Sequence, residues 1–121
     1  MPRLVELETP YKGKDYANLE KNIEYARACM RHCLLKGEAP FASHLLYTQP
    51  RVLDDKLTNE REMGIEAGLA WAVHAEATVV YTDLGISEGM VAAIRRAVKE
   101  KRPVEYRKLS DKEILFSHKS F

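Results

Sequence analysis

The chain alternates short apolar runs with longer segments of helical periodicity, and this alternation limits its fold more than any other feature. Strand-like runs cover residues 3–9, 38–43, 78–82 and 103–108. Apolar residues at three- and four-residue steps predict helices over about 16–36, 59–77 and 87–101. Strands that alternate with helices are typical of a parallel sheet with helices on both faces. The sequence therefore predicts a three-layer α/β fold, Rossmann-like or flavodoxin-like, with about four strands.

Length and composition are those of one soluble globular domain covering residues 1–121. The chain is 45% hydrophobic and 31% charged, with a net charge of +1. It has no basic block, so neither nucleic acid nor a membrane surface is an expected partner. The first ten residues lack an apolar signal region, and no run approaches the length of a membrane span. A cytoplasmic protein is expected.

Two cysteines, Cys29 and Cys33, lie four residues apart within the first expected helix. Helical positions at this spacing place the Cβ atoms about 6 Å apart, which is too far for an easy disulfide. No second pair of Cys or His completes a set of metal ligands. We expect buried free thiols, no metal site and a reducing compartment.

A ligand site is expected at the carboxyl ends of the strands, because open α/β sheets bind ligands there. The loops after the first three expected strands carry polar, aromatic and glycine residues. The candidates for substrate contact in these loops are Tyr11, Gly13, His44, Tyr47, Gly85, Ser87 and Gly89. A long connection, residues 44–61, adds apolar side chains, and long loops of this kind are often functional.

Glu88 begins the third expected helix and has two compatible roles. Ser87 can cap the helix, and a carboxylate in the first turn is favoured by the helix dipole. Gly85 lets the backbone turn sharply, and Gly89 leaves space beside the carboxylate. An ionised carboxylate held in this way beside a pocket can attack an electrophilic sugar carbon and form a covalent intermediate.

The other candidates also have a structural and a functional interpretation. Asp83 either makes a loop turn or binds a base and assists its departure. His44 is either a solvated loop residue or a ligand contact. Arg27, on the first expected helix, is either part of a solvated face or a phosphate contact. Tyr11 and Tyr47 either pack or stack on a base.

Several segments together resemble one protein family. They are "TPYKG", "ARACMRHCLLKGEAPFASHLLYTQ", "LDD", "EREMGIEAGL" and "DLGISEGMVAAI". They resemble the nucleoside 2-deoxyribosyltransferase-like family, in particular its small phage and bacterial members of unknown function, over residues 5–107. The deoxyribosyltransferases and the deoxynucleoside monophosphate N-glycosidases are more distant relatives in this resemblance.

The resemblance implies a nucleoside or nucleotide ligand, no cofactor, and a homo-oligomer whose site is shared between subunits, in the cytoplasm of a bacterium or phage-infected cell. It places Glu88 at the nucleophile of a "D-x-G-T-x-x-E-x-G" motif, with Asp83 as the motif aspartate and Tyr11 as the aromatic residue after the first strand. Here the motif reads "DLGISEG", with one residue fewer between the two acids and Ile86 where a small polar residue is usual.

Three functions remain open at the level of sequence. The first is an N-glycosidase or deoxyribosyltransferase that uses Glu88 as nucleophile and Asp83 as an assisting acid. The second is a noncatalytic nucleotide-binding protein, such as a phage protein that sequesters a host signal and counters defence. The third is a structural or assembly protein with a vestigial site, in which the apolar tail, residues 110–121, docks on a neighbouring subunit.

Overall fold

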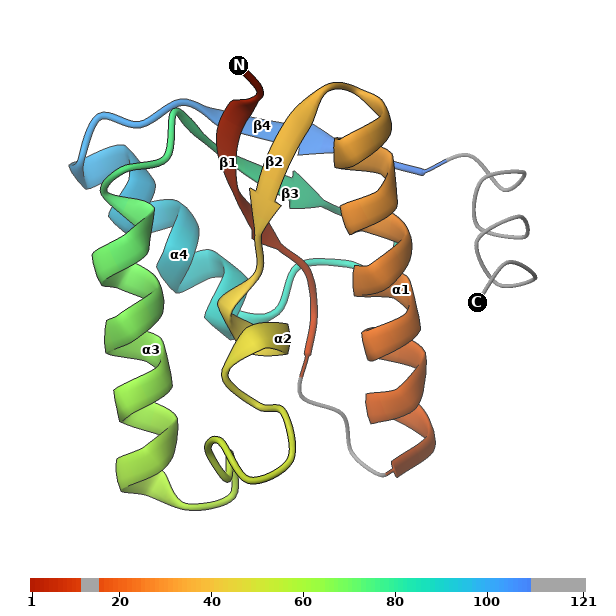
Figure 1. Ribbon diagram of the computed structural model, residues 1–121, viewed down its shortest axis with the longest axis vertical. Helices are drawn as coiled ribbons and strands as arrows, with labels where there is room; N and C mark the ends of the chain where they lie inside the picture. Colours follow the sequence, from red (N-terminus) through yellow and green to blue (C-terminus); the bar gives the residue numbers. More distant parts are fainter. Residues whose placement is uncertain (12–15, 110–121) are drawn as a thin grey trace.

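The computed structural model describes residues 1–11 and 16–109, and side chains in the first helix from Asn18 onward. Along the chain the elements are β1 (Arg3–Glu8), α1 (Tyr16–Leu35), β2 (Glu38–Phe41), α2 (Ser43–Leu46), α3 (Thr58–Ala72), β3 (Ala77–Tyr81), α4 (Glu88–Lys99) and β4 (Val104–Arg107). The four strands are parallel, in the order β2-β1-β3-β4. Helix α1 covers one face of the sheet, and α3 and α4 cover the other (Figure 1). The predicted three-layer α/β fold is confirmed.

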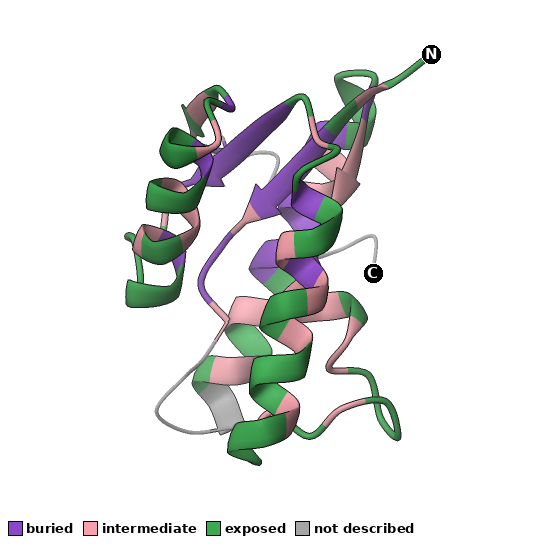
Figure 2. Cartoon of the chain, turned by 90° about the vertical axis from the view of Figure 1, so that its left-hand side faces the viewer, coloured by how far each residue is buried: buried purple, intermediate pink, exposed green. Residues whose placement is uncertain are grey.

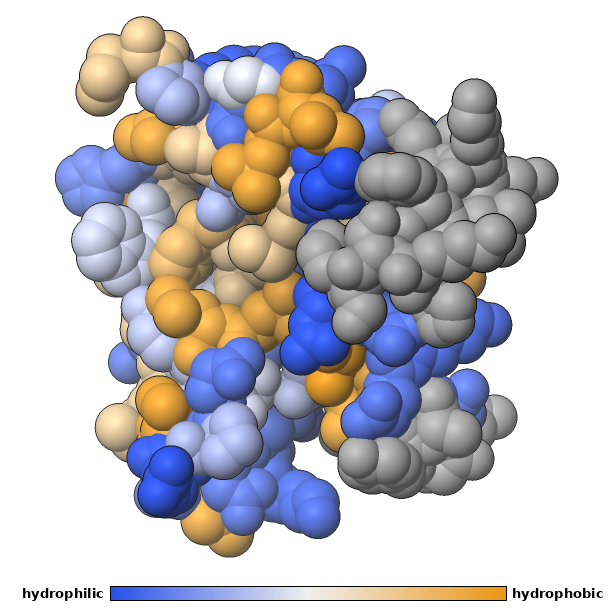
Figure 3. Space-filling view, turned by 45° about the vertical axis from the view of Figure 1, so that its right-hand side comes forward, coloured by the Kyte–Doolittle hydropathy of each residue, from blue (hydrophilic) through white to orange (hydrophobic). Residues whose placement is uncertain are grey.

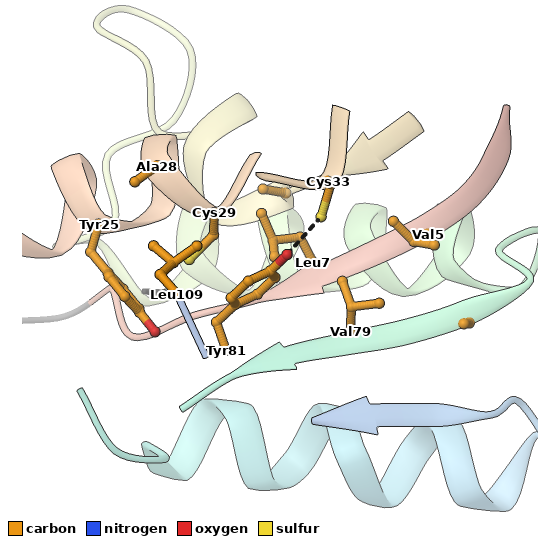
Figure 4. Close-up of a cluster of buried hydrophobic side chains, with 11 residues drawn as sticks. Val5, Leu7, Tyr25, Ala28, Cys29, Cys33, Val79, Tyr81 and Leu109 are labelled. Carbon is orange, nitrogen blue, oxygen red and sulfur yellow. Dashed lines mark hydrogen bonds between the residues drawn. The ribbon is translucent and has the colours of Figure 1, made fainter. Parts of the chain in front are cut away.

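The main core lies between the sheet and α1. Val5 and Leu7 of β1 point toward Cys29 and Cys33 of α1, and all five residues of β3 are buried (Figure 4). Both cysteines are free and buried, as expected. Figure 2 shows the buried strands behind helices whose outer sides are exposed. No helix in the described part of the chain is long and apolar enough to cross a membrane.

The observed elements differ from the sequence predictions in two places. The predicted helix over 59–77 ends at Ala72, because the backbone N–H of Glu76 donates to the carbonyl of Leu4 (2.8 Å) and draws the chain into the sheet. The connection over 44–61 is not wholly irregular, since α2 lies at its start. Pro40 lies in β2, which is an edge strand, and edge strands tolerate a residue without a backbone N–H. Gly13 and the tail lie outside the described residues.

An ion-pair network joins strands that are not neighbours. Arg107 of β4 donates both Nη groups to the carboxylate of Glu38 on β2, each at 2.7 Å. Arg107 also binds Glu105 at 2.9 Å, and Arg3 of β1 binds Glu105 at 2.6 Å. Because β2 and β4 are the two edges of the sheet, these contacts connect its opposite sides.

Candidate functional site

An open pocket of about 980 Å³ lies on the α3/α4 face of the sheet, beyond the carboxyl end of β1. The chain leaves β1 toward α1 on one face and leaves β3 toward α4 on the other. Adjacent strands whose connections diverge in this way form the topological switch point at which such sheets bind ligands. Residues of β1, α2, α3 and α4 line the pocket, so the expected site location coincides with a cavity.

A second hollow, of about 1320 Å³, adjoins this pocket along the loop between α2 and α3. The residues that line both are Tyr11, Thr48, Leu53, Asp55, Glu60, Arg61 and Ile65. The second hollow is lined mostly by loop residues and the first turns of α3, whereas the first reaches buried side chains of the central strand. The chemistry of the candidate site therefore belongs to the first pocket.

The pocket brings together most of the residues that were predicted from the sequence to contact a ligand. The selected residues in its lining are Tyr11, His44, Tyr47, Ser87, Glu88 and Gly89. Three others lie outside it. Arg27 is exposed on α1, which covers the opposite face, and Gly85 forms the turn after β3 with a φ of +87°. Asp83 is also absent from the lining.

Glu88 is the first residue of α4 and is exposed toward the pocket. The hydroxyl of Ser87 accepts a hydrogen bond from the backbone N–H of Met90 at 3.3 Å, and the N–H of Ser87 reaches the Met90 sulfur at 3.3 Å. This cap fixes the start of the helix and therefore the position of the Glu88 backbone. Glu88 therefore has the expected position at the helix start, and this position places its carboxylate at the wall of the pocket.

His44 and Tyr11 form one side of the pocket. The His44 Nε2 atom lies 2.8 Å from the hydroxyl of Thr9, and the rings of His44 and Tyr11 meet edge to face at 5.8 Å. Burial lowers the pKa of His44 to about 4, because the charged imidazolium would lose its solvation there. His44 is therefore neutral near pH 7 and can donate or accept a hydrogen bond without adding charge.

Asp83 is held by contacts away from the pocket. Its carboxylate accepts hydrogen bonds from the Tyr25 hydroxyl (2.6 Å) and from the backbone N–H of Leu109 (3.0 and 3.1 Å). Burial, followed by the bond to Asp83, raises the pKa of Tyr25, so the phenol remains a donor. Asp83 thus joins the end of β3 to α1 and to the chain after β4. This role was not among those predicted from sequence.

Two pocket residues that the sequence analysis did not select are Glu6 and Glu8 of β1. Alternate residues of a strand share a face, so both side chains point to the α3/α4 side, opposite Val5 and Leu7. Glu6 is buried and accepts a hydrogen bond from the Thr78 hydroxyl at 2.7 Å. The sequence signal was the pair of glutamates in "LVELE" on a strand expected at the centre of the sheet.

The local environment favours a proton on Glu8. Burial raises the pKa of Glu8 well above the ordinary value of 4.5, and the charge and hydrogen bond of Glu6 raise it further. The guanidinium of Arg102 opposes this shift only in part. A negative charge close to a buried carboxyl group disfavours its ionisation, so Glu8 retains its proton at a pH where an exposed glutamate is ionised.

Basic side chains of α3 and α4 complete the lining. We call this set the basic rim, and its members are Arg61, Arg95, Arg96 and Lys99. All four are exposed, and Arg96 also binds Glu100 at 2.7 Å. Guanidinium and ammonium groups are suited to phosphate oxygens. Within the described residues, no group of three or more His, Cys, Asp or Glu side chains could hold a metal ion.

The chain matches the model of a protein family. A family described as a domain of unknown function, DUF7768, matches residues 3–107. The chain belongs to the DUF7768 family. The match includes every strand and helix that the structure describes, so the whole described pocket lies within the DUF7768 domain. A search of curated proteins finds no match.

Proposed function

We propose that this DUF7768 protein cleaves or transfers at the N-glycosidic bond of a nucleoside or nucleotide, with Glu88 as the nucleophile. The observation that carries the proposal is the position of Glu88, which lies at a capped helix start on the wall of a pocket at the topological switch point. The resemblance of "DLGISEG" to the deoxyribosyltransferase motif supports the same assignment.

Each part of the pocket lining has a place in this reaction. Tyr11 and Tyr47 offer aromatic faces to the base, and neutral His44 offers a hydrogen bond to the base or sugar. The basic rim supplies cations for a 5′-phosphate. The Glu88 carboxylate attacks the anomeric carbon and forms a glycosyl ester, which water or an acceptor base then resolves.

In this proposal Asp83 contributes through the loop that carries Glu88. The carboxylate of Asp83 already accepts bonds from Tyr25 and Leu109. These bonds fix the end of β3, five residues before Glu88. Direct contact between Asp83 and a base would require these bonds to break, so another group of the pocket is better placed to assist the base.

The experiment that tests the proposal measures release of free base. Purified protein is incubated with a panel of nucleosides and 2′-deoxynucleoside 5′-monophosphates, and the products are identified by mass spectrometry. Loss of a catalytic nucleophile lowers turnover by about 10⁴-fold or more, so Glu88→Gln should abolish base release. Glu66→Gln, an exposed acid of α3 outside the pocket, is the matched control. Base release by Glu88→Gln at the wild-type rate would eliminate Glu88 as the nucleophile.

A second function, noncatalytic binding of a nucleotide, is favoured by the engagement of Asp83 and by the shortened motif. A protein of this kind, such as one that sequesters a signalling nucleotide, would keep the pocket without the reaction. It predicts that an intact ligand, for example a cyclic dinucleotide, is recovered from the protein fraction in stoichiometric amount. Recovery of degraded ligand would contradict it.

A homo-oligomer in the bacterial or phage-infected cytoplasm belongs to the same proposal. Hydrophobic side chains gather between hydrophilic ones on the face shown in Figure 3. Large apolar residues that are exposed in the single chain include Leu34, Leu35, Leu46, Met63 and Trp71. Surface of this kind is typical of subunit contacts. Light scattering of the purified protein would test the association, and a purely monomeric mass would remove it from the proposal.

A further inference from the structure

We propose that Glu8 is the catalytic acid that protonates the departing base, with Glu6 as its positioning residue. This inference rests on the N-glycosidase or transferase function proposed above and names the proton donor of that reaction. Glu8 and Glu88 line the same pocket, one from the central strand and one from the start of α4. The reaction needs an acid on the base side of the sugar, and the carboxylate of Asp83 is engaged elsewhere.

The first supporting observation is the set of polar contacts that hold the Glu6 carboxylate. The hydroxyl of Thr78 donates to Glu6 at 2.7 Å, and the guanidinium of Arg102 lies 3.9 Å from the same oxygen. Arg102 is itself buried and donates to Thr78 at 2.9 Å and to Glu100 at 2.7 Å. These contacts place a hydroxyl donor and a guanidinium at the Glu6 carboxylate and fix its position beside Glu8.

The second observation is the position of Glu8 relative to Glu6. Glu8 lies two residues nearer the carboxyl end of β1, and it is partly exposed where Glu6 is buried. Burial and the neighbouring Glu6 raise the pKa of Glu8, and the cationic partner Arg102 has its ion pairs with Glu6 and Glu100. The proton of the pair therefore resides on Glu8, the member that a ligand can reach.

The reaction then balances with water as the second reactant. The Glu88 carboxylate forms a bond to the anomeric carbon while the bond from that carbon to the base nitrogen breaks. The electron pair of the broken bond stays with the base, and the base receives the proton of Glu8 on nitrogen or on a conjugated oxygen. Glu8, now ionised beside Glu6, takes a proton from water as the hydroxide attacks the anomeric carbon and releases Glu88.

The test compares leaving groups that do and do not need a proton. One substrate is the nucleotide that wild-type protein cleaves; the other is 4-nitrophenyl 2-deoxyriboside 5-phosphate, whose nitrophenolate departs as a stable anion. Glu8→Gln should lose about 10²- to 10⁴-fold on the nucleotide and remain close to wild type on the aryl substrate. Glu88→Gln should lose activity on both substrates, and Glu66→Gln on neither.

The outcomes separate this inference from the proposed function. If Glu8→Gln loses equal activity on both substrates, or loses none on the nucleotide, the role of Glu8 is overturned while Glu88 remains the nucleophile. If wild-type protein cleaves neither substrate, the proposed function fails, and the role of Glu8 fails with it.

The pH profile gives a readout that a merely structural role would not move. The wild-type rate on the nucleotide should fall on the alkaline side as Glu8 loses its proton, and the rate on the aryl substrate should lack this fall. The other titratable or charged groups around the pocket are Glu6, Tyr11, His44, Tyr47, Asp55, Glu60, Arg61, Glu88, Arg95, Arg96, Lys99 and Arg102. An alkaline fall that persists in Glu8→Gln would assign it to one of these groups and overturn the inference.

A protonated carboxyl group also absorbs infrared light in a band that is separate from the bands of an ionised carboxylate. Difference spectra of wild-type protein and Glu8→Gln near pH 7 should show this band in the wild type alone. Its absence from wild-type protein would mean that Glu8 holds no proton to donate, and would overturn the inference without any measurement of activity.

Discussion

Among single residues, Glu8 has an environment that works against folding near neutral pH. Its pKa in the folded protein lies above the value of about 4.5 in the unfolded chain, because of burial and the neighbouring Glu6. The folded state therefore keeps a proton that the unfolded state releases. As pH rises from about 4.5 through the folded pKa, this difference removes stability.

Glu8→Gln should therefore raise the free energy of unfolding at pH 7. Glutamine keeps the shape of a protonated carboxyl and can donate its amide N–H to Glu6, but it has no proton to lose. Urea denaturation at pH 7 and pH 4 measures the effect, which should be larger at pH 7. A variant that is equally destabilised at both values would show that the packing of Glu8, rather than its ionisation, dominates.

Asp83 should contribute to stability through its two partners. In Asp83→Asn one oxygen becomes an NH₂ group that faces donors, either the Tyr25 hydroxyl or the N–H of Leu109. Leaving such a partly buried donor unsatisfied costs about 1–3 kcal/mol. Thermal and urea denaturation should show this loss for Asp83→Asn and none for the exposed control Glu66→Gln. Stability equal to wild type would mean that other contacts hold the end of β3.

The same residues show why part of the site could not be predicted from sequence. Glu88 was found because a helix start after a strand has a local pattern. Asp83 and Tyr25 are 58 positions apart, so no local pattern reports their hydrogen bond. Strand alternation places Glu6 and Glu8 on one face but does not reveal that the face holds a cavity. That cavity depends on how α3 and α4 pack.

At the level of elements, strong periodicity made most helices and strands predictable. Helix α2 was missed because four residues are too few to show a period. The end of α3 was predicted too late because apolar residues continue past Ala72, whereas the hydrogen bond from Glu76 to Leu4 of β1 decides where the chain turns. The first difference reflects the short length of the helix, and the second arises from a contact between elements that are distant in sequence.

The contact between α2 and α3 depends on a glycine. A Cβ atom added at Gly68 would lie 2.6 Å from Ser43 Oγ and 2.8 Å from Ser43 Cβ. Gly68→Ala should therefore destabilise the protein by about 1–3 kcal/mol, because α2 must shift away from α3. Denaturation measurements would show the change.

The reciprocal variant provides the control for this contact. Gly68→Ala combined with Ser43→Gly removes the atoms that clash, so the double variant should recover stability relative to Gly68→Ala alone, less the intrinsic effect of Ser43→Gly. A Cβ atom added at Gly64 would lie 3.3 Å from the flexible Leu53 side chain and 3.9 Å from Tyr47 Cβ, so Gly64→Ala should cost less than Gly68→Ala. Failure of the double variant to recover would place the strain elsewhere in α3.

For the whole molecule, the network around Arg107 connects the two edges of the sheet. Arg107→Met leaves the buried carboxylate of Glu38 without its bidentate partner, and breaking such a pair costs about 3–5 kcal/mol. Arg27→Met, at an exposed position of α1, is the matched control. Adding Glu38→Gln to Arg107→Met should restore part of the loss, because the buried carboxylate, which would otherwise keep only the 3.4 Å contact with Arg3, is then replaced by a neutral amide.

The same network gives the protein an acid-sensitive part of its stability. Hydrogen bonds from Arg107 lower the pKa of Glu38, and those from Arg3 and Arg107 lower the pKa of Glu105 to about 2. A lowered carboxyl pKa adds stability above the unfolded value of about 4.5, and this stability is lost as pH falls through the folded pKa. Denaturation between pH 5 and pH 2 should show a shallower loss for Arg107→Met than for wild type. If the stability of the two proteins falls equally with pH, the network is excluded as the source of the acid sensitivity.

The acid pair on β1 also has a consequence for laboratory evolution. A library randomised at position 8 and screened for heat resistance near neutral pH should enrich residues that carry no ionisable group, because these relieve the charge conflict with Glu6. The same library screened for release of base should retain glutamate. Opposite enrichment at one codon would separate selection for folding from selection for chemistry.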